Sequence, residues 1–308
     1  MSVQYVDRAT GKIEAEKIYG HRVLSLSYGD SWAARLFSFF FLPIFARLPW
    51  FSKFYGFLQK RPASAKKIAP FIAAYGVDAS EFAEANFQSF NDFFIRKLKP
   101  EKRPIAADAN RLAMPADGRY LVFPDLSRAN GFYVKGQQFD LDTFLQDTAY
   151  ANRYKTGAMA IARLCPTDYH RFHFPCDGLP SQARPIWGPL FSVNPIALRK
   201  KLSILWENKR MSTEIETDLF GTILCVEVGA TCVGSIHQTY QPEKQVKKGE
   251  EKGYFSFGGS CLVLLFERGR VAFDEDLIAN SQRGLETKAL FGSSLGMRIS
   301  SYMAVDLH

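Results

Sequence analysis

The chain has 308 residues, of which 47% are hydrophobic and 23% charged, a composition that is typical of a globular protein and excludes a disordered one. The net charge of +8 favours an anionic partner, but the basic residues are dispersed and no nucleic-acid-binding motif accompanies them, so we expect no nucleic acid. Five cysteines without a C-x-x-C pair argue against a disulfide scaffold or a thiolate zinc site, and they fit a reducing compartment.

The first part of the chain predicts an arm followed by short helices. Residues 1–20 alternate polar and apolar side chains and indicate a short strand or arm, with no apolar signal core that would direct secretion. The longest apolar run, residues 36–45, is about half the length of about twenty residues that a membrane-spanning helix needs. We therefore expect no membrane span.

Residues 22–75 carry a helical pattern that is rich in aromatic and basic side chains. Pro43 and Pro49 divide this segment into short helices. Aromatic rings sit at the headgroup level of a membrane while cations meet anionic lipid, so the segment favours an interfacial anchor. The alternative is a helical layer that packs on the core. Residues 80–100 predict a further amphipathic helix.

From about residue 110 onward, short β-branched runs alternate with Gly, Pro and Asp. Residues 119–123, 158–162, 222–228 and 261–266 are typical strands. We expect an α+β fold, in which an N-terminal helical, membrane-associating layer (residues 1–105) lies on a largely antiparallel β catalytic core (residues 106–308).

Three groups of reactive side chains lie in the β half. Asp117 occupies a Pro-Ala-Asp-Gly turn before a strand, His170 and His173 lie three residues apart, and Ser260 follows two glycines. Each has an ordinary structural explanation, since Asp-Gly and Gly-Ser pairs form turns and many histidines only pack. Together they supply the carboxylate, imidazole and hydroxyl of a catalytic triad.

Two other assignments use some of the same residues or their neighbours. His170, His173 and His237 with Asp117 could bind a divalent metal, but the H-x-x-H spacing places no general base between the ligands, and we expect no metal. The segment Val246-Lys247-Lys248-Gly249 is similar to the hairpin of a biotinyl or lipoyl carrier, which would not need the triad residues.

The motifs around Asp117, His170 and Ser260, in this order, resemble the bacterial pyruvoyl-dependent phosphatidylserine decarboxylases. The resemblance runs through nearly the whole chain and includes residues 90–98, 190–195, 228–230 and 233–236. The Phe-Gly-Gly-Ser form at residues 257–260 is similar to the branch of the family that has Gly-Gly-Ser in place of Leu-Gly-Ser.

The resemblance implies that the chain cleaves itself between Gly259 and Ser260. In the family, the serine hydroxyl attacks the preceding carbonyl, and β-elimination then leaves a new N-terminus that becomes a pyruvoyl group. Ser260 would thus become the cofactor, and the precursor would become a β chain, residues 1–259, and an α chain, residues 260–308. Cys261 stands where the family commonly has Thr or Ser, but the attacking hydroxyl and its target are unchanged, so cleavage is expected.

The same resemblance implies roles for the other site residues. His173 would deprotonate Ser260, Asp117 would orient His173, and His170 would handle the substrate or the decarboxylation proton. The substrate amine would form a Schiff base with the pyruvoyl group, and phosphatidylserine would lose CO2 to give phosphatidylethanolamine. A lipid substrate in an anionic membrane implies a peripheral enzyme at the cytoplasmic face of the cell membrane, and the family suggests a homodimer.

Two points stay open at this stage. A Ser-His-Asp hydrolase would use Ser260 on its substrate and leave the backbone intact. A second Gly-Ser pair, Gly292-Ser293, could be mistaken for the processing site, but it lacks the second glycine and predicts a turn.

Overall fold

The structure is a computed structural model that describes residues 3–17, 49–127, 133–134, 137–138, 140–193, 203–230, 236–258 and 260–299. Residues 18–48, which include half of the expected aromatic segment, lie outside the described residues, as does Gly259 at the expected cleavage site. Parts of two motifs that carry the family resemblance, residues 194–195 and 233–235, also lie outside them.

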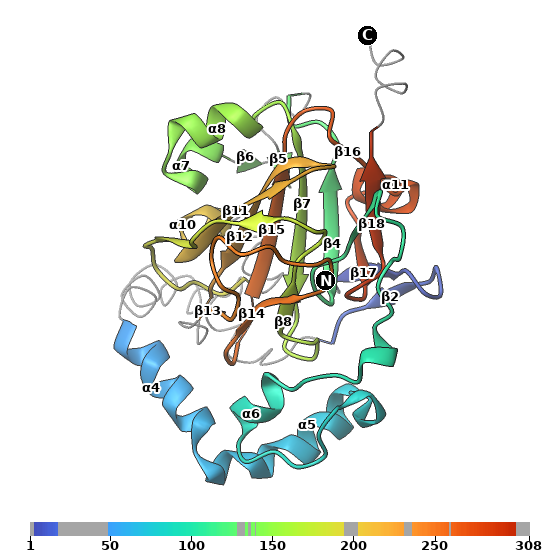
Figure 1. The fold of residues 1–308 in the computed structure, drawn as a ribbon. Helices are drawn as coiled ribbons and strands as arrows, with labels where there is room; N and C mark the ends of the chain where they lie inside the picture. The colour runs from blue at the N-terminus through green and yellow to red at the C-terminus, as the bar shows by residue number, and fades with distance from the viewer. Residues whose placement is uncertain are drawn as a thin grey trace.

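A large, mostly antiparallel sheet forms the centre of the molecule (Figure 1). Its strand order is β10-β11-β12-β15-β7-β4-β17-β1-β2, with β9 paired to β11, and only β1 and β17 run parallel within it. The strands are β1 (Gln4–Asp7), β2 (Ile13–Ala15), β4 (Gly118–Phe123), β7 (Ala158–Leu164), β9 (Leu179–Pro180), β10 (Arg184–Ile186), β11 (Arg210–Thr217), β12 (Gly221–Val228), β15 (Ser260–Phe266) and β17 (Glu286–Ala289).

The two central strands, β7 and β15, are buried on both faces. Every residue of each strand is buried, as expected for continuous apolar runs that have neighbours above and below. Successive side chains alternate between two core clusters: Leu262 and Leu264 belong to one, and Val263 and Leu265 to the other. The helices α7 (Leu141–Leu145), α8 (Thr148–Tyr154) and α10 (Ile204–Glu207) contribute to the second cluster, and α11 (Glu275–Gln282) to the first.

Three smaller sheets complete the β structure of the described residues. One has the order β13-β14-β8, formed by Ile236–Gln238, Glu251–Phe255 and Arg171–His173. Another has the order β16-β18-β3, formed by Val271–Phe273, Ser294–Arg298 and Arg111–Ala113. The pair β5 (Tyr133–Val134) and β6 (Gln137–Gln138) forms the third. The predicted α+β class with a largely antiparallel core is confirmed.

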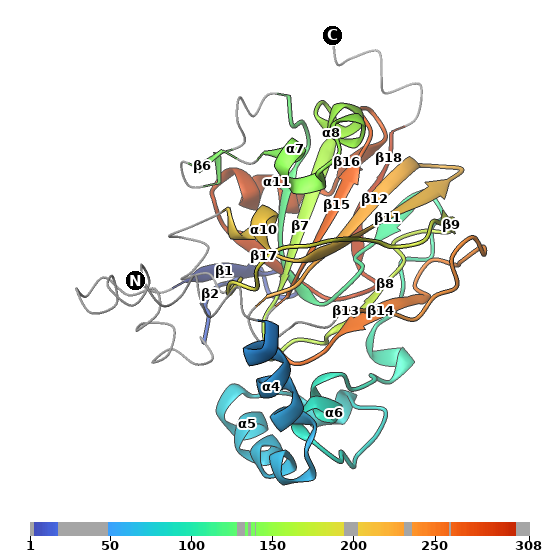
Figure 2. The same ribbon diagram turned by 90° about the vertical axis from the view of Figure 1, so that its left-hand side faces the viewer.

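Short helices gather at one end of the large sheet, as Figures 1 and 2 both show. We call them the helical layer: α4 (Pro49–Lys60), η1 (Pro62–Lys67), α5 (Ile68–Tyr75), η2 (Ala79–Glu81) and α6 (Phe90–Phe94), with η3 (Pro100–Lys102) leading to the core. Its aromatic side chains form a third core cluster with Phe257, whose ring centroid lies 5.2 Å from that of Phe90. None of the described helices is both long and apolar enough to cross a bilayer.

The helix expected over residues 80–100 is much shorter in the structure. Only α6 is α-helical there. It begins at Phe90 because the Ser89 hydroxyl caps it by accepting the N–H of Asp92 at 3.1 Å. The flanking segments instead meet in an isolated antiparallel bridge between Phe82 and Leu98. The expected boundary between the N-terminal layer and the catalytic core at residue 105 stays a prediction. Strands β1 and β2 precede the helical layer in the chain but belong to the large sheet.

A fully buried ion pair joins the large sheet to the β13-β14-β8 sheet. The ammonium of Lys252 on β14 lies 2.6 Å from a carboxylate oxygen of Glu227 on β12, and both side chains are inaccessible to solvent. The ammonium also donates to the hydroxyl of Thr213 at 3.0 Å and to the side-chain oxygen of Gln238 at 2.9 Å. Because these contacts use all three donors, the charge is fully satisfied.

We expect Lys252→Met to destabilise the protein by about 3–5 kcal/mol, because it leaves the Glu227 carboxylate buried without its cation. Urea denaturation measures the change in the free energy of unfolding. Replacing both partners, Lys252→Met with Glu227→Leu, should recover much of that loss. Lys247→Met is the matched control, since the Lys247–Asp177 pair is exposed to solvent and should contribute little to stability. Equal losses for Lys252→Met and Lys247→Met would contradict the prediction.

Candidate functional site

Ser260 begins the central strand β15, and its side chain is completely buried. The preceding loop is held on the other side by the helical layer, where the side chain of Asn91 accepts the N–H of Phe257 at 3.2 Å. Gly258 has φ 133°, a backbone conformation that side chains other than glycine rarely adopt. Cys261 is also buried, and burial raises the pKa of its thiol to about 12, so the thiol stays neutral beside Ser260.

His170 is the imidazole that contacts Ser260. Its Nδ1 lies 3.4 Å from the Ser260 hydroxyl, and its Nε2 lies 2.8 Å from the carbonyl oxygen of Cys165. A carbonyl only accepts, so Nε2 carries the hydrogen and Nδ1 presents its lone pair to the hydroxyl. Burial, together with the charge of Arg96, lowers the pKa of His170 to about 3, so the ring is neutral at pH 7.

His173 has different partners. Its Nδ1 lies 3.0 Å from the carbonyl oxygen of Gly249, and its Nε2 lies 3.2 Å from the hydroxyl of Tyr169. The ring stacks on Phe291, with centroids 3.7 Å apart, and burial lowers the pKa of His173 to about 4. Both ring nitrogens are therefore bonded within the protein, and neither contacts Ser260.

Asp117 forms a buried ion pair instead of a bond to histidine. One carboxylate oxygen lies 2.7 Å from the guanidinium of Arg103, which also binds Glu81 at 2.9 Å. The carboxylate also accepts the N–H of Phe291 at 2.8 Å. Burial raises the pKa of Asp117, and the ion pair with Arg103 opposes that shift. The structure thus brings Ser260 and His170 together, whereas Asp117 and His173 meet through Phe291.

Phe291 is held by the turn at Gly292-Ser293, for which the sequence predicts a turn and no further role. Gly292 has φ 86°, and a Cβ there would lie 2.6 Å from the carbonyl oxygen of Pro104. The carbonyl oxygen of Gly292 accepts the N–H of Ala106 at 2.8 Å. The N–H of Gly292 donates to the carbonyl oxygen of Met114 at 3.0 Å. No local pattern in the sequence indicates that this turn places an aromatic ring against His173.

The residues of the two other assignments are engaged elsewhere. His237 donates to or accepts from the Ser256 hydroxyl at 2.9 Å and stacks on Tyr254. In the part of the chain that the structure describes, no three His, Cys, Asp or Glu side chains gather as metal ligands would. In the carrier-like segment, the ammonium of Lys248 donates to the carbonyl oxygen of Asp108 at 2.7 Å.

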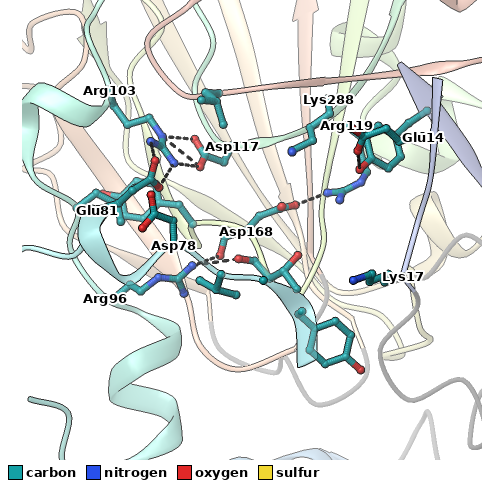
Figure 3. Close-up of a pocket in the computed structure, with 18 of the residues that line it drawn as sticks. Glu14, Lys17, Asp78, Glu81, Arg96, Arg103, Asp117, Arg119, Asp168 and Lys288 are labelled. Carbon is teal, nitrogen blue, oxygen red and sulfur yellow. Dashed lines mark hydrogen bonds and ion pairs between the residues drawn. The ribbon is translucent and has the colours of Figure 1, made fainter. Parts of the chain in front are cut away.

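A cavity of about 460 Å3 adjoins the site on the side of Asp117 (Figure 3). Its wall includes Tyr169, the residue whose hydroxyl contacts His173. Basic side chains from several parts of the chain also line it: Lys17, Arg96, Arg103, Arg119 and Lys288. In the sequence these residues are dispersed, and only the fold brings them to one cavity.

Comparison with known proteins finds similar chains over nearly the whole length. The family model for phosphatidylserine decarboxylase matches residues 90–297. The chain is 44% identical over 295 residues to a phosphatidylserine decarboxylase proenzyme of Chlamydia pneumoniae, covering 95% of this chain and 96% of that protein. It is 45% identical over 299 residues to the proenzyme of Chlamydia muridarum, covering 96% and 98% of the two chains.

We expect the protein to lose stability between pH 7.5 and pH 5 because His170 and His173 are buried in the neutral form. Their pKa values in the folded protein, about 3 and about 4, lie below the ordinary value of 6.5, so the unfolded chain binds more protons below pH 6.5. The resulting loss is about 2 kcal/mol per histidine at pH 5. His237, whose pKa burial also lowers, adds a loss of the same sign.

Urea denaturation at the two pH values measures this loss. In a His173→Gln variant the difference between pH 7.5 and pH 5 should shrink by about 2 kcal/mol, because one of the two groups no longer titrates. An unchanged difference in that variant would show that His173 is not buried as a neutral ring.

Proposed function

This chain belongs to the phosphatidylserine decarboxylase family, and from that premise we propose that Ser260 is the residue it consumes to become an enzyme. The protein is a self-processing decarboxylase that converts phosphatidylserine to phosphatidylethanolamine and CO2 with a pyruvoyl group formed from a serine. A pyruvoyl group supplies the electron sink for the carbon–carboxylate bond that breaks. This activity replaces the hydrolase alternative, in which the backbone would stay intact.

The observation that carries the assignment of Ser260 is its buried hydroxyl facing a neutral imidazole at the start of a central strand. The other candidate, Ser293, donates its hydroxyl hydrogen to the carbonyl oxygen of Leu290 at 2.7 Å, and that contact is exposed. Of the two serines, only Ser260 therefore has both exclusion of water and an imidazole at its hydroxyl. We place the cut between Gly259 and Ser260, which divides the chain into residues 1–259 and 260–308.

For the proton transfers we retain the division that the family implies. His173, with Asp117 close by through Phe291, takes the Ser260 proton during cleavage, and His170 handles the substrate or the decarboxylation proton. In the structure His170 contacts Ser260 at 3.4 Å, which is long for a hydrogen bond, and burial lowers the pKa of both rings, so their pKa values do not distinguish the two roles. His173 must then exchange its bond to Tyr169 for one to Ser260 before cleavage.

Surface features of the helical layer support contact with an anionic membrane. Helix α4 exposes Phe54, Phe57 and Leu58, which lie three and four residues apart and so share one helix face. The guanidinium of Arg61 lies over the ring of Phe57 at 5.8 Å, which places a cation beside the apolar face. A lipid substrate requires such contact, and rings with adjacent cations suit an anionic interface. A homodimer and a position at the cytoplasmic face remain predictions from the family.

Self-cleavage tests the site assignments directly. We expect the purified wild-type protein to run as two chains on a denaturing gel, with intact masses that match residues 1–259 and 260–308, and Ser260→Ala to remain one chain. His173→Ala and Asp117→Asn should also remain uncleaved, whereas His170→Ala should cleave and then fail to decarboxylate. The reverse result, in which His170→Ala stays uncleaved and His173→Ala cleaves, would identify His170 as the base, and a wild-type protein that stays intact would overturn the proposal.

Membrane contact is tested by replacing the exposed rings of α4. The double variant Phe54→Ser/Phe57→Ser should bind phosphatidylserine vesicles at least tenfold more weakly in co-sedimentation. The reason is that two apolar side chains are no longer transferred from water into the membrane interface. Ile13→Ser is the matched control, since Ile13 is equally exposed but lies on β2, outside the helical layer. If the double variant binds vesicles as the control does, α4 is not the docking surface.

A further inference from the structure

The cavity in Figure 3 lies between segments that are far apart in the sequence. Its wall comes from the β1–β2 hairpin, the end of α5, the segment around Arg96, the start of β4, the loop of residues 167–169 and the strand β17. Its volume of about 460 Å3 falls in the range of small-molecule sites, about 300–1,000 Å3. The chemistry of the wall therefore decides which ligand it suits.

Most cations of the wall already have a carboxylate partner within the protein. Arg103 pairs with Asp117, and Arg119 pairs with Asp168 at 2.5 Å. Lys288 pairs with Asp7 at 3.0 Å. The carboxylates that remain also have partners: one oxygen of Glu14 accepts the Tyr5 hydroxyl, and one oxygen of Asp78 accepts the N–H of Ser80.

Arg96 differs from these cations. Its guanidinium donates only to backbone carbonyls, including those of Thr167 at 3.0 Å and Asp168 at 3.1 Å, as Figure 3 shows. Within the described ranges, no carboxylate lies at ion-pair distance from it, and its Nε has no hydrogen-bond partner. Lys17 makes no ion pair either but is exposed, so Arg96 is the buried cation of the wall that lacks an ion pair among the described residues. The nearby charges of Asp117, Asp168 and Glu81 raise its pKa without forming a contact.

Burial makes this arrangement costly. Arg96 is only 5% exposed, and burial lowers the pKa of its guanidinium to about 10. The rings of Phe82 and Phe93, at 5.1 and 4.9 Å from the guanidinium carbon, offset part of the cost. A buried cation with an unused donor is stabilised further when an anion binds beside it.

The position of Arg96 links the cavity to the catalytic groups. The charge of Arg96 is close enough to His170 to lower its pKa. Tyr169, which bonds His173, and Asp117 both line the same cavity. An anion held at Arg96 therefore shares the cavity with Asp117 and with Tyr169, the contact partner of His173.

We propose that Arg96 binds the phosphate of the phosphatidylserine headgroup in this cavity, an inference that rests on the proposed function. The headgroup carries two anions, a phosphate and a carboxylate, and the carboxylate leaves as CO2. A cation paired with the carboxylate would stabilise the substrate more than the transition state and would slow the reaction. The phosphate keeps its charge throughout, so a cation there holds the headgroup without opposing the chemistry.

The test uses the self-cleaved enzyme with Arg96→Gln and Arg96→Lys, and Lys97→Gln as the matched control, since Lys97 is adjacent in sequence but exposed. Denaturing gels first confirm that each variant cleaves, which separates this inference from the proposed function. Arg96→Gln should then raise KM for phosphatidylserine in mixed micelles about tenfold or more, with kcat changed less than threefold. Arg96→Lys should fall between Arg96→Gln and wild type, and Lys97→Gln should match wild type.

Soluble probes distinguish the phosphate of the headgroup from other anions. Glycerophosphoserine should inhibit wild type competitively and Arg96→Gln at least tenfold more weakly. Serine, which has the carboxylate but no phosphate, should inhibit both equally. The proposal is overturned if KM is unchanged in Arg96→Gln or if neither Arg96 variant cleaves. It is also overturned if serine no longer inhibits Arg96→Gln, or if inorganic phosphate inhibits wild type noncompetitively as strongly as glycerophosphoserine does.

Discussion

The pairing of β15 on both sides is the constraint on which the rest of the structure depends. Ser260 pairs with Leu164 on β7, and the following residue, Cys261, pairs with both β7 and Val228 on β12. The Ser260 hydroxyl is thus fixed to the most buried part of the sheet, while residues 256–258 belong to no ladder. In the described structure five ladders join residues 260–308 to the rest of the chain: β15 pairs with β7 and β12, β17 with β4 and β1, and β18 with β3. These ladders hold the segment in place whether or not the chain is cut.

In the site, the two imidazoles are neutral and the charged side chains lie around them. His170 and His173 are each held in one tautomer by a backbone carbonyl, and burial keeps both rings neutral. The buried cations stand one layer further out, with Arg103 bound to Asp117 and Arg96 facing the cavity. A proton that reaches either ring therefore creates charge where water cannot screen it, which favours its release. Under the proposed roles, His170 would return that proton to the substrate.

The sequence predicted the central strands well and the contacts of the site poorly, for one physical reason. Strands such as residues 158–162 and 261–266 are buried on both faces, so their apolar runs are visible in the sequence alone. The helix expected over residues 80–100 was wrong in extent because a local cap and a bridge between its flanks compete with helical periodicity. The family resemblance identified the motif residues, but the partner of Asp117 is set by tertiary packing that no local pattern encodes.

Phe291 shows why assembly of the fold must precede any cut. Its ring lies against His173 and its N–H binds Asp117, yet both partners belong to residues 1–259 and Phe291 belongs to residues 260–308. The segment that carries Ser260 therefore also carries the residue that joins the acid to the imidazole. An intact chain reaches this arrangement only after β15 and β17 have entered the sheet, so under the proposed roles folding completes the site before it acts on its own backbone. The ladders that make cleavage possible are the same ones that keep the two segments together afterwards.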